Sequence, residues 1–154
     1  MSNMVPHPAE SQMRPSAISE PMSSQLAAVT AFELGSVERY TGTVHVARIL
    51  RAADDTVRAY EVCFEAGART VWHAHTGEQF LVTLSGRCVV QCVDASAHLL
   101  GPGDCFRVAA GIRHWHGALP GGAAAQLALN AHGPTEWGRP VSDTEFSVAV
   151  RSLA

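Results

Sequence analysis

Three histidines and one glutamine in this 154-residue chain have the types and the spacing of a metal site. His73 and His75 are two residues apart, so in an extended strand their side chains project from one face and can bind one ion together. A turn at 76–77 lets Gln79 project into the same space from the next strand, and His114 follows thirty-five residues later. Three imidazoles and one amide oxygen suit a divalent Mn, Fe, Co, Ni or Zn ion with open coordination positions, which is typical of a catalytic site.

Glu78 is the alternative fourth ligand, because adjacent strand residues face opposite sides and only one of the pair 78 and 79 can point inward. The spacing favours Gln79. A neutral glutamine leaves the ion its full formal charge, so the ion should be a stronger Lewis acid and should be held more weakly than in a site with a carboxylate.

His116 follows His114 by two residues and therefore faces the same space in a regular strand. An imidazole near a divalent cation has its charged form disfavoured, so we expect His116 to be neutral at pH 7 and able to accept a proton as the catalytic base. The alternative is that it only hydrogen-bonds a ligand or a backbone group. Trp72 and Trp115 flank the histidines by one residue and should pack on the opposite face.

The elements that must position these residues are short strands. Turn residues such as Asp, Gly, Pro and Ser separate eight apolar, β-branched segments, a spacing that predicts a single all-β sandwich or barrel. The segments are 42–51, 57–65, 78–84, 87–93, 97–100, 104–108, 112–118 and 124–131. Gly86 should reverse a hairpin at positive φ. The tail at 137–150 is an edge strand or a short helix. Residues 1–28, rich in Pro and Ser, are expected to be a disordered arm, which leaves 29–154 as the folded domain.

The runs RTVWHAHTGEQFLVT, RHWHGALPGG and EWGRPVSDTEF resemble the cupin family, whose fold is a double-stranded β-helix or jelly-roll barrel. They are most similar to the small bacterial cupins that include manganese-dependent hydroxynitrile lyases and carboxymuconolactone decarboxylase-associated cupins. Glutamine is itself a ligand in that group, so the resemblance implies His73, His75, Gln79 and His114 as the metal ligands, with manganese as the first expectation.

The same resemblance places His116 beside the open metal positions. The lyases of the group have a further pocket histidine where this chain has Gln126, so we expect Gln126 to line the substrate pocket. The function implied is a lyase-type metal enzyme that acts on a small organic molecule. An Fe(II)-dependent oxygenase and a non-catalytic ligand-binding cupin are the alternatives. Small cupins pair their barrels through edge strands, so we also expect a homodimer.

Bulk properties exclude other classes. A net charge of −3 gives no basic surface for nucleic acid or anionic membranes, and no apolar run approaches the length of a membrane span. The N-terminus lacks the charged start and apolar stretch of a secretory signal. Four cysteines without a Cys-x-x-Cys pair are interpreted as free thiols, which favours a cytoplasmic protein.

Overall fold

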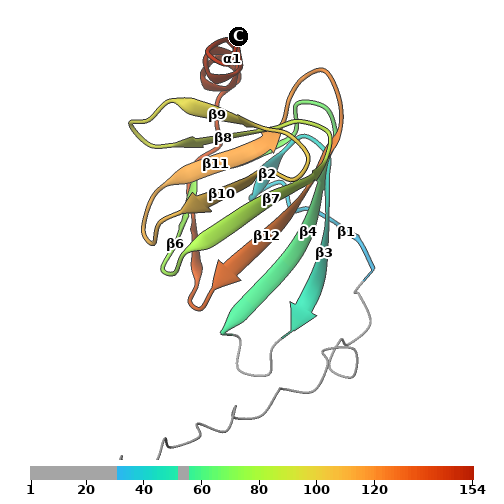
Figure 1. Ribbon diagram of the computed structural model, residues 1–154, viewed down its shortest axis with the longest axis vertical. Helices are drawn as coiled ribbons and strands as arrows, with labels where there is room; N and C mark the ends of the chain where they lie inside the picture. The colour runs from blue at the N-terminus through green and yellow to red at the C-terminus, as the bar shows by residue number, and fades with distance from the viewer. Residues whose placement is uncertain (1–30, 52–55) are drawn as a thin grey trace, which may run out of the picture.

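The structure is a computed structural model that describes residues 31–51 and 56–154, and the predicted arm at 1–28 lies outside these ranges. Two antiparallel sheets face each other and curl into a barrel (Figure 1). In spatial order the first sheet contains β1 (Glu33–Leu34), β3 (Val44–Arg51), β4 (Val57–Phe64), β12 (Ala124–Ala131), β7 (Gln79–Ser85) and β10 (Cys105–Val108). The second contains β13 (Thr135–Trp137), β6 (His73–His75), β11 (His114–Ala118), β5 (Arg69–Thr70) and β2 (Tyr40–Thr41), with β8 (Cys88–Cys92) on β11 and β9 (Ala97–Leu100) on β8.

Side chains alternate between the barrel interior and the outside along the central strand β12. Its buried residues run from Ala124 through Gln126 and Ala128 to Asn130. Phe64 lies opposite Ala124, whereas Arg58 lies opposite Asn130. The interior therefore changes along the strand from an apolar core, to which Phe64 and Ala124 belong, to a polar region that is able to bind ligands.

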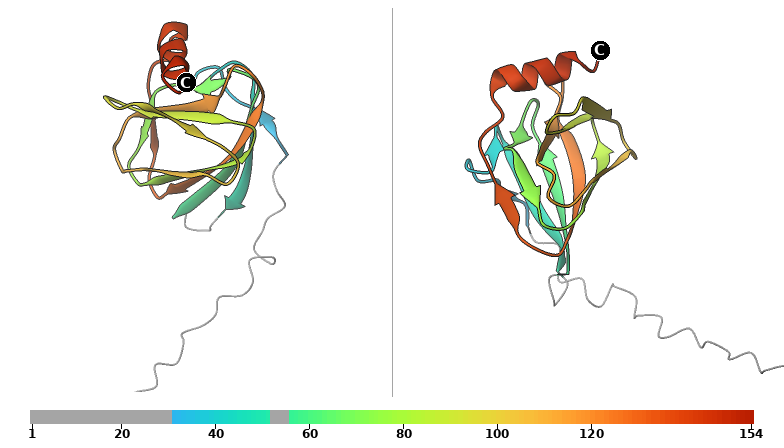
Figure 2. Two further views of the ribbon diagram at one scale, coloured as in Figure 1. Left: turned by 45° about the horizontal axis from the view of Figure 1, so that its top comes forward. Right: turned by 90° about the vertical axis from the view of Figure 1, so that its left-hand side faces the viewer.

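The helix α1 (Asp143–Arg151) lies outside the barrel, across the sheet that carries β11 (Figure 2). It begins with a capping box, in which the Ser142 side chain accepts from the backbone N–H of Glu145 and the Glu145 carboxylate accepts from that of Ser142. Phe146 packs edge-on against Trp115 at 5.7 Å between ring centroids. Trp115 is fully buried in this outer cluster, so the orientation expected for it is confirmed.

The eight predicted strands are all present, with bounds that differ from the expected ones by at most two residues. The tail contains both alternatives, the edge strand β13 and the helix α1. Gly86 has φ +70°, and a Cβ there would come within 2.2 Å of the Ala123 carbonyl oxygen, so no other residue fits this turn without a shift. The four cysteines are free thiols, and Cys105 is exposed. Within the described residues, no helix has the length and apolar character needed to cross a membrane.

Candidate active site

Three buried histidines converge inside the barrel. His73 comes from β6, and His114 and His116 come from β11, where His114 lies directly opposite His73. One ring nitrogen from each lies within 4.8 Å of the others. The three side chains are at most 3% exposed. Buried imidazoles this close together, with no acidic residue among them, form a donor set that fits a divalent metal ion.

Hydrogen bonds to the backbone orient two of these rings. His73 Nδ1 lies 2.9 Å from the Val71 carbonyl oxygen, and His114 Nδ1 lies 2.9 Å from that of Ile112. Because a carbonyl oxygen only accepts, each Nδ1 carries the proton and each Nε2 presents a lone pair. A backbone carbonyl on the outer ring nitrogen is the usual support for a metal-binding histidine.

His75 contributes a fourth nitrogen. Its Nδ1 lies 3.0 Å from the Thr135 hydroxyl, and its Nε2 is buried with no hydrogen-bond partner among the described residues. An unpaired buried nitrogen costs free energy unless something binds it, and metal coordination at Nε2 removes that cost.

Gln79 faces His114 in an arrangement that needs a cation. Its Nε2 donates to the Asn130 side-chain oxygen at 2.8 Å, which turns its Oε1 toward His114 Nε2 at 2.7 Å. Both of these atoms are acceptors once His114 Nδ1 holds the proton. Two lone pairs at this distance repel each other in the free protein and are stabilised by a shared cation. The residues present therefore fit a metal.

The observed triple shares two members, His73 and His114, with the predicted ligand set. It includes His116 in place of His75, although the His75 ring lies 5.1 Å from that of His73 and 5.5 Å from that of His114, between centroids, which is no farther than the His116 ring. Gln79 is buried against His114, as the spacing indicated. Glu78 instead forms an ion pair with Arg107 on the surface, and this placement supports Gln79 over Glu78 as the inward residue.

Burial keeps these imidazoles neutral. Burial, followed by repulsion from His114, lowers the pKa of His116 to about 3. Burial also lowers the pKa of His75 and of His114 to about 4, and that of His73 well below its usual value. At pH 7 all four rings are therefore neutral, and each can offer a ring-nitrogen lone pair to a metal ion.

Gln126 contacts His116, the expected base. His116 Nδ1 lies 2.8 Å from Gln126 Oε1, so Nδ1 carries the proton and Nε2 presents the lone pair. Thr70 fixes the same residue through its hydroxyl oxygen, which accepts from the His116 backbone N–H at 3.1 Å. Gln126 is fully buried behind His116, and it is not among the residues that line the cavity.

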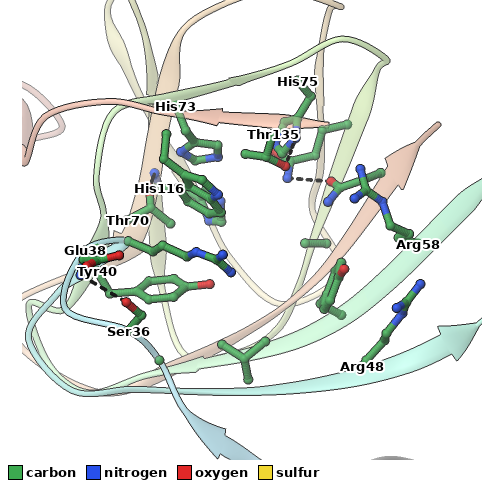
Figure 3. Close-up of a pocket in the computed structure, with 18 of the residues that line it drawn as sticks. Ser36, Glu38, Tyr40, Arg48, Arg58, Thr70, His73, His75, His116 and Thr135 are labelled. Atoms are coloured by element: carbon green, nitrogen blue, oxygen red, sulfur yellow. Dashed lines mark hydrogen bonds between the residues drawn. The ribbon is translucent and has the colours of Figure 1, made fainter. Parts of the chain in front are cut away.

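A cavity of about 810 Å³ opens onto these groups (Figure 3). His73, His75, Gln79 and His116 line one part of it. The remaining wall includes residues that the motif analysis did not identify, among them Tyr40, Arg48, Arg58, Tyr60, Thr70, Asn130, Thr135 and Trp137. Strand parity was the available signal for several of them, because Arg58 and Tyr60 share a face with the buried Val62 and Phe64.

Comparison with known proteins identifies the family. The family model described as a cupin domain matches residues 60–129. The (R)-mandelonitrile lyase of Granulicella tundricola is 33% identical over 116 residues, which cover 73% of this chain and 88% of that protein. The chain belongs to the cupin family. A cupin-like protein from Thermotoga maritima has a TM-score of 0.73 at 32% identity over 75% of this chain and 91% of its own.

A further solved structure shares the fold at lower identity. The DMSP lyase from Ruegeria pomeroyi has a TM-score of 0.56 at 20% identity and covers 73% of this cupin and 59% of its own chain. The family, the named relative and the histidine cluster together support an enzymatic cupin with a metal-binding site.

Proposed function

We propose that this cupin is a metal-dependent lyase-type enzyme, similar to hydroxynitrile lyases, that acts on a small organic molecule through an oxygen atom. The observation that carries the proposal is the convergence of acceptor atoms at Gln79 and His114 next to a second, oriented imidazole at His116. The name of the mandelonitrile lyase relative supports the reaction class. His73, His75, Gln79 and His114 are the proposed ligands, and manganese is the first expectation for the metal, with Fe, Zn, Ni and Co as alternatives.

Bound at these residues, a divalent ion would supply Lewis acidity to a hydroxyl or carbonyl oxygen. His116 is the proposed proton-transfer group. Because the Gln126 oxygen accepts a hydrogen bond from Nδ1–H, Nε2 is the basic nitrogen, and His116 lines the cavity. In cyanohydrin cleavage, His116 Nε2 would take the hydroxyl proton while the carbon–cyanide bond breaks. An aldehyde and cyanide form, and the imidazolium then returns the proton to cyanide as hydrogen cyanide.

The surroundings of His116 suit this cycle. Phe64 lies edge-on to its ring at 5.7 Å between centroids, which limits access of water to that side. The Gln126 oxygen stabilises the transient imidazolium, and this hydrogen bond raises the pKa of His116 against the larger lowering by burial. The His116 imidazole is thus neutral before the reaction, and the Gln126 oxygen can stabilise its charged form.

The test is metal analysis joined to activity. Protein purified without a metal-affinity tag should contain close to one transition metal per chain. Chelation should abolish mandelonitrile cleavage, measured as benzaldehyde formation, and manganese should restore it with and without oxygen. Oxygen consumption by the iron-loaded protein without any cleavage would favour the oxygenase alternative. Protein that takes up no metal would favour a non-catalytic binding module.

A further inference from the structure

Two arginines project into the barrel interior on the wall formed by β3 and β4. Arg58 shares the inward face of β4 with Tyr60, Val62 and Phe64, and Arg48 lies directly opposite Tyr60 in the neighbouring strand. Both arginines line the cavity, on one side of it in Figure 3. An inward-facing charge in a barrel is costly to desolvate unless it is paired.

Arg58 lies one strand away from a residue that orients a proposed metal ligand. It lies directly opposite Asn130, whose side-chain oxygen accepts from Gln79 Nε2 at 2.8 Å. Its Nη2 donates to the Gly133 carbonyl oxygen, and Thr135, two residues further along that turn, contacts His75 Nδ1. The positive charge of Arg58 also acts on His75, whose pKa is lowered mainly by burial, then by His114 and by Arg58.

The donors of Arg58 are not all used. A guanidinium has five N–H groups, and the Gly133 carbonyl takes one of them. The Nε is buried and has no hydrogen-bond partner among the described residues. None of the ion pairs between described residues involves Arg58. This side chain can therefore still donate in the fork geometry that fits a carboxylate.

The charge balance of the wall favours an anion. Besides Arg48 and Arg58, the cavity is lined by one further arginine, Arg39, and by two glutamates, Glu33 and Glu38. Both glutamates are exposed, and Glu38 lies across the cavity from Arg48 and Arg58 in Figure 3. The histidine and glutamine donors are uncharged, so they do not offset the charge of Arg58 or of a bound divalent ion.

The remaining wall suits the body of an aromatic or aliphatic molecule. Tyr60 and Val46 lie between the arginines and the apolar core, and Ala128 lies directly opposite Tyr60 in the neighbouring strand β12. Burial raises the pKa of Tyr40 to about 12, so its phenol stays neutral and can donate a hydrogen bond. The cavity thus has an imidazole end, a mixed aromatic wall and a cationic side.

We propose that the substrate of this site carries a carboxylate, which binds Arg58 with Arg48 beside it while the reacting oxygen faces the histidine cluster. This inference rests on the proposed function for the reacting end, and it adds the chemical class of the substrate. Arg58 is assigned to carboxylate binding, and no proton transfer is assigned to it.

A purely structural role is the competing explanation for Arg58. Its hydrogen bond to Gly133 ties β4 to the turn before β13, which would stabilise the fold without any ligand. That role predicts a lower melting temperature on substitution and no selectivity among ligands. Anion binding predicts a loss that depends on the charge of the ligand.

The experiment is calorimetric titration of the full manganese-loaded chain with mandelate, methyl mandelate and phenyl phosphate. Mandelate is the carboxylate counterpart of mandelonitrile, the ester removes only the charge, and the phosphate tests for general anion binding. The variants are Arg58→Met, Arg58→Lys and, as a matched control, Arg87→Met. Arg87 is exposed and lies outside the cavity. Metal content and melting temperature are measured for each protein.

Mandelate should bind the wild type and Arg87→Met more tightly than its ester does. Arg58→Met should keep its metal and lose roughly tenfold or more in mandelate affinity, with little change for the ester. Arg58→Lys keeps the positive charge and should lose less mandelate affinity. If Arg58→Met fails to fold, the affinity of Arg58→Lys decides the outcome. Equal binding of acid and ester, or mandelate affinity that ignores Arg58, would overturn the inference. Tighter binding of the phosphate would replace carboxylate by phosphate as the substrate group.

Mandelonitrile cleavage by the wild type is measured as well, because it tests the proposed function independently of mandelate binding. Cleavage without Arg58-dependent mandelate binding would remove only the carboxylate inference. Arg58-dependent binding without cleavage by any metal form would retain the anion site and remove the hydroxynitrile lyase assignment.

Discussion

The side-chain oxygen of Gln79 lies 2.7 Å from Nε2 of His114, and both atoms are acceptors, because the other nitrogen of His114 donates to a backbone carbonyl. In most buried sites a donor meets an acceptor. Here Asn130 takes the only donor group of Gln79 and directs its oxygen at the imidazole. A cation bound by both atoms would remove this repulsion. Metal binding would therefore stabilise the packing of β7, which carries Gln79, against β11, which carries His114.

With His73, Gln79 and His114 as ligands, His75 and His116 are the two candidates for one further ligand position. The metal content of single variants distinguishes between them. We expect His75→Ala to lose most of the metal, like His73→Ala and His114→Ala, because its buried Nε2 has no other partner among the described residues. His116→Ala should retain close to one ion per chain, measured by elemental analysis of tag-free protein. Loss of metal in His116→Ala with full occupancy in His75→Ala would make His116 the ligand instead.

Gln79 sets the charge of the proposed metal site. Gln79→Glu should tighten metal binding, measured as resistance to chelators, and should slow metal-dependent catalysis, because a carboxylate reduces the charge felt by the substrate. Glu78→Gln is the matched control. Its ion pair with Arg107 is exposed and screened by solvent, so this substitution should change neither property. Chelator resistance that responds to Glu78 and ignores Gln79 would contradict the orientation in the structure.

Sequence patterns predicted the strands and the grouping of the histidines, because both depend on residues that are close together along the chain. Alternation along a strand places His114 and His116 inward and Trp115 outward, and a turn glycine fixes the hairpin at Gly86. The predictions did not include Arg58, Asn130 or Thr135 in the cavity. Their roles arise from cross-strand register, which depends on pairing between segments far apart in the chain. Gln126 was expected in the pocket wall, whereas its position behind His116 follows from the same packing.

Acid should destabilise the metal-free protein. The pKa values of His75 and His114 are about 4 when folded, against about 6.5 in an unfolded chain. Between these values the unfolded state binds more protons, so the free energy of unfolding falls as pH drops from about 6.5 toward 4. Each pKa unit corresponds to about 1.4 kcal/mol. Urea unfolding of chelator-treated protein at several pH values measures this slope, and His116→Gln should make it shallower. A flat profile would be inconsistent with buried neutral imidazoles.

The homodimer expected from the sequence stays a prediction. β1 lies at the edge of its sheet, and Leu34 and Val37 near it are 70% and 89% exposed. An exposed apolar sheet edge favours pairing with a second chain. Light scattering at micromolar concentration should give twice the chain mass, both for the full chain and for a chain that begins at residue 29. Leu34→Glu should shift the mass toward the monomer, whereas a monomeric wild type would remove the prediction.

His116 provides the sharpest test of the chemistry, because Gln126 fixes which of its nitrogens is basic. His116→Ala should keep the metal and the fold and lose about 10²–10⁴-fold in rate, the usual range for removal of a general base. Gln126→Leu should leave the Nδ1 proton unpaired in the core and lower the rate without changing metal content.

Gln126→His should raise mandelonitrile cleavage, because it places an imidazole beside His116 at the position where the resemblance implies that the lyases have one. All four proteins are compared after loading with manganese, by benzaldehyde formation at several substrate concentrations. If His116→Ala matches the wild type, proton transfer does not pass through this residue, and the proposed lyase mechanism fails. If Gln126→His gives no gain, the lyase-like mechanism also loses its support, and the iron oxygenase alternative moves ahead.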